Sequence, residues 1–160
     1  MLPDSTPATA WRLTRAPYAD LSGRGGQLKS GRWNTQGRPV VYLSLEASLP
    51  VLEVLMNLDL ALEDLPPDYV LMRVDLSPLL ARYGDAGVED ATDVETLSQT
   101  ARSFGDTWLA EGRTPCLRVA SHLIPEASNL LLNPLHPGAS LLEAPSHRPF
   151  RFDPRLFAHR

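Results

Sequence analysis

Apolar positions fall into short segments along this chain, and the segments follow two different spacings. Runs rich in β-branched and aromatic residues are typical of strands. Such runs lie at residues 11–14, 38–45, 69–76, 115–121 and 129–133. Apolar residues at helical spacing predict helices at 48–58 and 93–111. The segment 149–157 alternates aromatic and basic residues like an edge strand, and 17–37 is expected to be mainly loop. The pattern predicts one mixed domain of helices and strands.

The predicted helices have suitable residues at their ends. Ser48 can cap the first helix, and Pro50 is tolerated there because it falls in the first turn. Gly112 ends the second helix. The predicted buried side of the second helix consists of Leu97, Ala101, Phe104, Trp108 and Leu109. We therefore expect this helix to pack one face against the core.

Composition narrows the class of protein. With 160 residues, of which 43% are apolar and 21% charged, the chain can bury a core as one domain spanning 1–160. A formal net charge of −4 argues against a general nucleic-acid binder. The single cysteine, Cys116, excludes an internal disulfide and fits a reducing cytoplasm. No leader pattern is present, and no apolar run approaches the roughly 18 residues of a membrane span. We expect a soluble cytoplasmic protein without membrane or direct nucleic-acid contacts.

Charge is unevenly distributed along the chain. Between Trp11 and Tyr42 the only acid is Asp20, whereas the cations are Arg12, Arg15, Arg24, Lys29, Arg32 and Arg38. Glycines alternate with the cations of residues 23–38, where backbone N–H and guanidinium groups could together bind an anion. Neither the dinucleotide fingerprint nor a P-loop is present, and a glycine-rich surface loop with incidental cations is the alternative. Residues 85–95 hold five acids and no cation, which is typical of a solvated face.

Two residues are candidates for chemistry because of their surroundings. Glu53 is the only charged residue in 49–58, so its carboxylate is expected to lie against mostly apolar surface. A buried carboxylate has a shifted pKa or a partner, although it can also reach solvent or pair with an arginine for structural reasons. Tyr42 follows the basic loop in a predicted strand. It is either a core residue or a stacking platform for a planar heterocycle.

Other familiar constellations are absent from the sequence. There is no C-x-x-C, H-E-x-x-H or G-x-S-x-G motif. The histidines lack the spacing of metal ligands; they are His122, His136, His147 and His159. Ser121 and His122 are adjacent in a predicted strand, so their side chains point to opposite faces and do not form a nucleophile–base pair. No metal site is expected.

Several short motifs occur together along the chain. They are WRL at 11–13, GRWN at 31–34, VVYLS at 40–44, LEVL at 52–55, RVAS at 118–121, NLLLNPLHP at 129–137 and PFRFDPRL at 149–156. In this order they resemble the RES domain family, the toxins of Xre–RES toxin–antitoxin pairs. The resemblance spans about residues 11–156. The family name refers to an arginine, a glutamate and a serine, which correspond here to Arg32, Glu53 and Ser121.

The resemblance implies a fold like that of ADP-ribosyltransferase toxins, of the α+β class. In that fold a split, mainly antiparallel β core is flanked by helices and binds NAD in its cleft. It implies cleavage of the nicotinamide–ribose bond by an NAD phosphorylase, an NAD glycohydrolase or a protein ADP-ribosyltransferase. Phosphorolysis is the expected reaction, with NAD as substrate, inorganic phosphate as co-substrate and no permanently bound cofactor. An Xre-like antitoxin is the implied partner, and an inactive nucleotide- or antitoxin-binding module is the alternative of another class.

The resemblance also suggests residue roles. The expected catalytic residues are Arg32, Tyr42, Glu53 and Ser121. The expected NAD contacts are Arg12, Arg32, Trp33, Asn34, Tyr42 and Asn133. Glu53 could accept a hydrogen bond from a ribose hydroxyl and stabilise developing positive charge, with Leu49 and Met56 excluding water around it. Arg32 could hold the pyrophosphate or an incoming phosphate. An exposed edge at 149–157 is compatible with a homo-oligomer.

Overall fold

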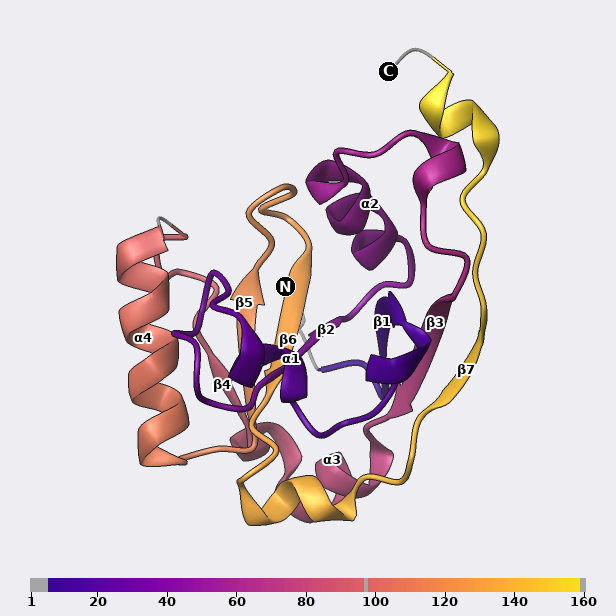
Figure 1. Cartoon of the computed structure of the whole chain (residues 1–160). Coiled ribbons are helices and arrows are strands. Elements are labelled where there is room, and N and C mark those ends of the chain that lie inside the picture. Colours follow the sequence, from indigo (N-terminus) through magenta and orange to yellow (C-terminus); the bar gives the residue numbers. More distant parts are fainter. Residues whose placement is uncertain (1–5, 97, 159–160) are drawn as a thin grey trace.

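A seven-stranded sheet forms the centre of the computed structural model, which describes residues 6–96 and 98–158 (Figure 1). The strands are β1 (Thr9–Arg15), β2 (Val41–Ser44), β3 (Tyr69–Asp75), β4 (Val88–Asp90), β5 (Cys116–Ala120), β6 (Ser128–Leu132) and β7 (Ser146–Pro149). Their order is β4-β5-β6-β2-β1-β3-β7, and every neighbouring pair is antiparallel except β4–β5. The predicted α+β class with a mainly antiparallel sheet is confirmed.

Helices flank this sheet on different sides (Figure 1). They are α1 (Arg24–Leu28), α2 (Ser48–Asn57), α3 (Ser77–Tyr83) and α4 (Ser98–Glu111). Short 3-10 turns lie at Ala16–Tyr18, Leu62–Asp64, Gly84–Gly87, Pro137–Leu141 and Pro154–Phe157. The helix α4 connects the parallel strands β4 and β5, as a crossover between parallel neighbours requires. No helix in the described ranges has the length and apolarity to cross a bilayer.

The strand β6 explains why residues 130–132 are all leucine rather than alternately apolar and polar. Successive side chains of a strand point to opposite faces. Leu130 and Leu132 therefore enter the core that contains Leu79 of α3, whereas Leu131 enters the core that contains Trp108 of α4. All three leucines are completely buried because both faces of the central sheet are covered.

The sheet is nearly divided between β1 and β2. These strands are joined at the pair Trp11↔Ser44 alone, whereas β1 pairs with β3 along its full length. If the β1–β2 register continued, Leu13 would face Tyr42. Instead the two strands separate, and both of these side chains line a cavity. This separation is the split in the β core that the family resemblance implied.

Most of the predicted elements are found, with small shifts at their ends. The five predicted strands correspond to β1, β2, β3, β5 and β6, and the two predicted helices to α2 and α4. Ser48 is the first residue of α2 rather than its cap, and the cap position is taken by Ala47. In α4, Ala101, Trp108 and Leu109 are buried as predicted and Phe104 is partly buried, whereas Leu97 lies outside the described residues.

Three elements were missed because each is short. The helix α3 begins with Ser77-Pro78, a pair that also ends a strand, and it has seven residues. The helix α1 has five residues within the segment predicted as loop. The acidic segment 85–95 contains the strand β4, which has three residues. A strand this short leaves no pattern in the sequence. Four of the five acids in this segment are exposed, as a solvated face requires.

The prediction of an edge strand at 149–157 is wrong in its position. The edge strand is β7, which pairs with β3 and ends at Pro149. Phe150 and Phe152 then leave the sheet edge and pack onto a third cluster, together with Phe157. Asp153 and Pro154 start a 3-10 turn, in which the Asp153 carboxylate accepts from the backbone N–H of Arg155.

This third cluster fixes α2 to the sheet. Phe152 is 7% exposed and contacts the rings of Tyr69, Phe150 and Phe157 edge to face, at centroid distances of 5.5, 5.2 and 6.1 Å. The same cluster includes Leu55 of α2. The C-terminal segment therefore acts as a strap that holds α2 from outside.

Removal of this anchor should destabilise the protein. We expect Phe152→Ala to lower the free energy of unfolding by about 3–5 kcal/mol, because a buried aromatic ring is replaced by a cavity. The matched control is Leu156→Ala in the same segment, where the side chain is 45% exposed and the expected cost is below about 0.5 kcal/mol. Urea unfolding measures both; equal costs would mean that the strap does not contribute through Phe152.

Candidate active site

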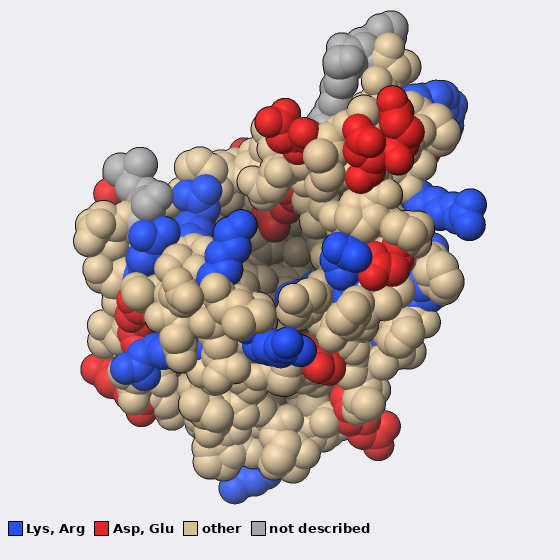
Figure 2. All heavy atoms as spheres, viewed as in Figure 1, with Lys and Arg blue, Asp and Glu red and all other residues tan. Residues whose placement is uncertain are grey.

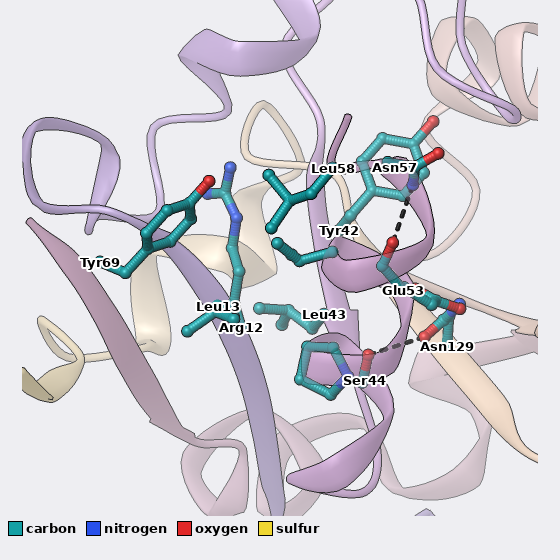
Figure 3. Close-up of a pocket in the computed structure, with 12 residues that line it drawn as sticks. Arg12, Leu13, Tyr42, Leu43, Ser44, Glu53, Asn57, Leu58, Tyr69 and Asn129 are labelled. Atoms are coloured by element: carbon teal, nitrogen blue, oxygen red, sulfur yellow. Dashed lines mark hydrogen bonds between the residues drawn. The ribbon is translucent and has the colours of Figure 1, made fainter. Parts of the chain in front are cut away.

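A cleft opens where β1 and β2 separate, beneath α2, and it has two lobes. The first lobe, of about 370 Å³, lies between β1 and α2, and Arg12, Leu13 and Tyr69 line its far side (Figure 3). The second lobe, of about 940 Å³, extends toward α4. The residues common to both lobes are Tyr42, Glu53, Asn57 and Asn129. Cavities of roughly 300–1,000 Å³ are of the size that binds small molecules. Figure 2 shows the opening as a hollow with an acidic side chain inside it and cations around it.

Glu53 lies at the junction of the two lobes, on the middle of α2. Its Oε1 accepts hydrogen bonds from Ser121 Oγ and from Asn129 Nδ2, each at 2.8 Å. Its Oε2 receives no hydrogen bond from the described residues. The predicted partner is therefore found, but it consists of two neutral donors rather than an arginine. One oxygen of the carboxylate is fixed and the other is available to a ligand.

Ser121 is oriented by three hydrogen bonds. Its hydroxyl accepts from the backbone N–H groups of Leu123 and Ile124, both at 3.2 Å, and donates to Glu53. The side chain is 1% exposed. Because its proton and its lone pairs are already used, Ser121 positions Glu53 and is not a nucleophile. His122 is exposed and instead contacts Thr96 Oγ1 through Nδ1, at 3.1 Å.

Asn129 was not anticipated from the sequence. It is the cross-strand partner of Ser44, whose hydroxyl donates to Asn129 Oδ1 at 2.8 Å and so orients the amide toward Glu53 (Figure 3). Tyr42 and Ser44 are two residues apart in β2 and share its cleft face. The spacing of Tyr42 and Ser44 indicates a polar face of β2. It identifies Asn129 only when the pairing of β2 with β6 is known, because Asn129 lies opposite Ser44.

Tyr42 organises the loop that precedes its strand. Its Oη donates to Asn34 Oδ1 at 2.6 Å and accepts from the backbone N–H of Trp33 at 3.1 Å. A Cβ on Gly31 would lie 2.6 Å from this oxygen, so only glycine allows the loop to approach. Burial raises the pKa of Tyr42 to about 12, assisted by Asp106 and opposed by the Trp33 hydrogen bond, Arg102 and Arg32. The phenol is therefore neutral at physiological pH.

The basic loop contributes cations to the cleft, and three of its glycines use their backbone N–H groups within the loop. The N–H groups of Gly26, Gly31 and Gly37 donate to acceptors within the loop. Lys29 and Arg32 line the second lobe, whereas Arg24 and Arg38 line neither lobe. The side chains of Lys29 and Arg32 are therefore available to an anion in the second lobe.

Arg12 is the cation of the first lobe. Its Nη1 donates to the carbonyl oxygen of Tyr18 at 3.4 Å. Burial lowers the pKa of Arg12, and the charge of Asp20 opposes this shift. A half-buried guanidinium of this kind retains its charge and gains from an anionic ligand.

Three of the predicted NAD contacts are buried, and of these Trp33 lines the second lobe whereas Asn34 and Asn133 line neither lobe. Trp33 is 2% exposed and its ring packs edge to face on Phe104. Asn34 is completely buried, and its amide donates to the carbonyl oxygen of Gly26 at 3.1 Å. Asn133 is 3% exposed and lines neither lobe; it donates to the carbonyl oxygen of Leu109. The structure thus brings Arg12, Arg32, Trp33, Tyr42, Glu53 and Ser121 to the cleft, whereas Asn34 supports Tyr42 from the loop.

The surroundings of Glu53 also differ from the expectation. Leu49 is buried in the core, but Met56 is 64% exposed at the rim of the second lobe. In the described part of the chain, no group of three or more His, Cys, Asp or Glu side chains could hold a metal ion; His159 lies outside that part.

A family model and curated relatives identify the family of this chain, and a solved structure shares its fold. The model of the RES domain matches residues 9–153. The chain is 34% identical over 147 residues to Toxin Res of Pseudomonas putida strain KT2440, covering 92% of this chain and 98% of that protein. It is also 34% identical over 143 residues to the Prs ADP-ribosylating toxin of Sphingobium sp. strain YBL2, covering 86% of each. Among solved structures, a chain of the M. tuberculosis MbcT–MbcA toxin–antitoxin complex has a similar fold, with a TM-score of 0.61 and 17% identity over 96% of this chain and 88% of that chain.

The raised pKa of Tyr42 predicts a loss of stability in alkali. The unfolded chain releases this proton near pH 10, whereas the folded protein holds it to about pH 12, so the folded state binds more protons in between. The free energy of unfolding should fall there by about 1.4 kcal/mol per pH unit. Tyr42→Phe should lack this slope. Urea unfolding across the window tests it, and parallel curves for the two proteins would contradict the assignment.

The buried hydroxyl of Ser121 should be important for stability as well as for geometry. Ser121→Ala removes a donor from Glu53 and leaves two backbone N–H groups unsatisfied, so we expect a cost of about 1–3 kcal/mol. The control is Ser140→Ala, where an exposed hydroxyl donates to the carbonyl oxygen of Pro137 and the cost should stay below about 0.5 kcal/mol. Chemical denaturation compares the two, and a neutral Ser121→Ala would mean that the three bonds are dispensable.

Proposed function

This chain belongs to the RES domain family, and on that premise we propose that it is a toxin that consumes NAD by phosphorolysis. The reaction cleaves the nicotinamide–ribose bond and gives nicotinamide and ADP-ribose-1''-phosphate. One observation carries the proposal: Glu53 presents a carboxylate at the junction of two ligand-sized lobes, with one oxygen fixed by Ser121 and Asn129.

The chemistry requires stabilised positive charge more than proton transfer. The C1''–N bond breaks with its electron pair on the nicotinamide nitrogen, so nicotinamide leaves neutral and needs no acid. The ribose then has oxocarbenium character. The free Oε2 of Glu53 accepts a hydrogen bond from a ribose hydroxyl. The negative charge of the carboxylate stabilises the positive charge that develops on the ribose. An unprotonated oxygen of hydrogen phosphate supplies the electron pair for the new C1''–O bond, so no base is needed either.

Other groups of the cleft have roles that follow from their positions. The Tyr42 hydroxyl is occupied by Asn34 and Trp33, so its ring, rather than its oxygen, contacts the substrate, by stacking or by orienting the ribose. Arg12 and Arg32 lie in different lobes and provide charge for the phosphates of the substrates. Ser121 and Asn129 act through Glu53.

Transfer of ADP-ribose to a protein is the second candidate. It is favoured by the 34% identical relative whose name is Prs ADP-ribosylating toxin. The same carboxylate would stabilise the same sugar cation, and only the acceptor would differ. Hydrolysis, with water as acceptor, is the third outcome of the same chemistry.

We also propose an antitoxin of the Xre-like class as the partner, covering the cleft. The similar solved fold is that of a toxin in a toxin–antitoxin complex. Met56 and Leu123 are 64% and 38% exposed, and both line the second lobe. Exposed apolar side chains at the edge of a cleft favour a protein partner.

The experiment is a proton NMR time course of purified protein with NAD, with and without phosphate. We expect nicotinamide and ADP-ribose-1''-phosphate, formed only with phosphate. Glu53→Gln keeps the shape of the side chain but removes its charge, and should slow release of nicotinamide by about 100-fold or more. The matched control is Glu46→Gln, an exposed glutamate just before α2, whose rate should equal that of wild type.

The products decide between the candidates. Plain ADP-ribose that forms equally without phosphate would indicate a hydrolase. Intact NAD in every sample would contradict phosphorolysis, and labelling of a protein by labelled NAD would then favour transfer. A fully active Glu53→Gln would remove the catalytic role of the carboxylate.

A further inference from the structure

Three cations gather in the second lobe of the cleft, and one of them comes from a helix that sequence patterns gave no functional role. They are Lys29 and Arg32 of the basic loop and Arg102 of α4. None of the three forms an ion pair with a carboxylate in the described parts of the chain. In the space-filling view, cationic side chains lie on the α4 side of the central hollow (Figure 2). Glu53 is the one carboxylate among the described residues that line this lobe, so three cations against one acid leave its lining with net positive charge.

The two arginines are held in fixed orientations by backbone oxygens. Arg32 Nη1 donates to the carbonyl oxygen of Thr96 at 2.9 Å, and Arg102 Nε donates to the carbonyl oxygen of Gly31 at 3.2 Å. Each guanidinium has five N–H donors, so one such bond leaves several free. A guanidinium oriented in advance loses less entropy when it binds an oxyanion in a two-point contact.

A close approach of backbone segments brings Arg102 to this position. A Cβ on Gly105 would overlap the carbonyl oxygen of Trp33, so glycine allows α4 to pack directly on the loop. Arg102 lies one turn earlier in α4 and thereby reaches Gly31. Arg102 and Arg32 both act on the phenol of Tyr42, where their charges oppose the rise in its pKa. The two guanidinium groups therefore lie near Tyr42, and all three side chains line the second lobe together with Glu53.

We propose that Lys29, Arg32 and Arg102 form a subsite for the acceptor, an inorganic oxyanion such as phosphate, and that Arg102 is its principal new member. The inference rests on the proposed phosphorolysis and adds where the acceptor binds. The first lobe has its own cation, Arg12, for the diphosphate of NAD. The second lobe is larger and shares Glu53 with the first, so an anion bound at the Glu53 end of this lobe would adjoin the carbon that Glu53 stabilises.

The subsite fits the chemistry of the acceptor step. A phosphate dianion would otherwise be repelled by the Glu53 carboxylate that it must approach. Three cations offset this repulsion and position the attacking oxygen. Arsenate has the same charge and shape and should replace phosphate; the ADP-ribose arsenate ester then reacts with water to give ADP-ribose and free arsenate.

The test is a steady-state measurement of nicotinamide release with phosphate and NAD varied in turn. We expect Arg102→Gln to raise the KM for phosphate by about tenfold or more, the effect of losing a charge-assisted contact, and the KM for NAD by less than about threefold. The matched control is Arg38→Gln. Arg38 is an exposed arginine of the basic loop that lines neither lobe, so both KM values should stay at those of wild type.

The outcomes separate this inference from the proposed function. If wild type releases nicotinamide with no dependence on phosphate, phosphorolysis fails and the subsite fails with it. If wild type is phosphate-dependent but Arg102→Gln raises the KM for NAD instead, the three cations hold the NAD diphosphate, and the subsite alone is overturned.

Should Arg102→Gln fail to fold, Lys29→Gln replaces it, because Lys29 is exposed. Titration of inorganic phosphate alone into Glu53→Gln, with and without Arg102→Gln, gives an independent readout: binding that Arg102→Gln does not weaken overturns the subsite.

Discussion

A carboxylate on a mostly apolar helix must be given hydrogen-bond donors, and the arrangement of this fold follows from that need. Glu53 is on α2, but its donors come from the end of β5 and from β6, and the amide of Asn129 is in turn oriented by Ser44 of β2. A charge without partners in a low-dielectric environment is costly, whereas two good donors on one oxygen offset much of that cost. The donors can reach Glu53 only because α2 packs over β1 and β2 with this carboxylate directed toward β5 and β6. The aromatic strap of Phe150, Phe152 and Phe157 holds α2 there from the other side.

The split between β1 and β2 supplies the space that this arrangement uses. A continuous β1–β2 ladder would bring Leu13 and Tyr42 together and close the first lobe. The single pair Trp11↔Ser44 keeps the sheet connected while the strands diverge beyond it. Full pairing of β1 with β3 and of β2 with β6 holds the two strands in place on their other sides. The cleft is thus a consequence of the sheet's own pairing pattern and needs no mobile loop.

Local patterns in the sequence were sufficient to single out Glu53 as a candidate site residue, but they did not identify the residues that surround it in the cleft. A lone charge in an apolar helix is visible in one dimension, and so are the main strands, because burial imposes a period. Asn129 and Arg102 are not visible in this way. Asparagine in a strand and arginine on an amphipathic helix are ordinary solvated residues until the β2–β6 register and the packing of α4 at Gly105 place them in the cleft. One glycine of the basic loop has a role that the sequence did not predict, because Gly31 is required for the contact with Tyr42.

The distribution of charge explains how an acidic protein can attract anions. The net charge of −4 acts at long range and is screened beyond about 8–10 Å in physiological salt. Lys29, Arg32 and Arg102 act within the cleft, where low-dielectric walls weaken the field less than water does. A small anion that enters the second lobe meets these cations directly, whereas an extended polyanion also meets the acidic outer surface. The local positive charge of the second lobe is therefore compatible with the proposed small phosphate substrates, even though the total charge of the protein is negative.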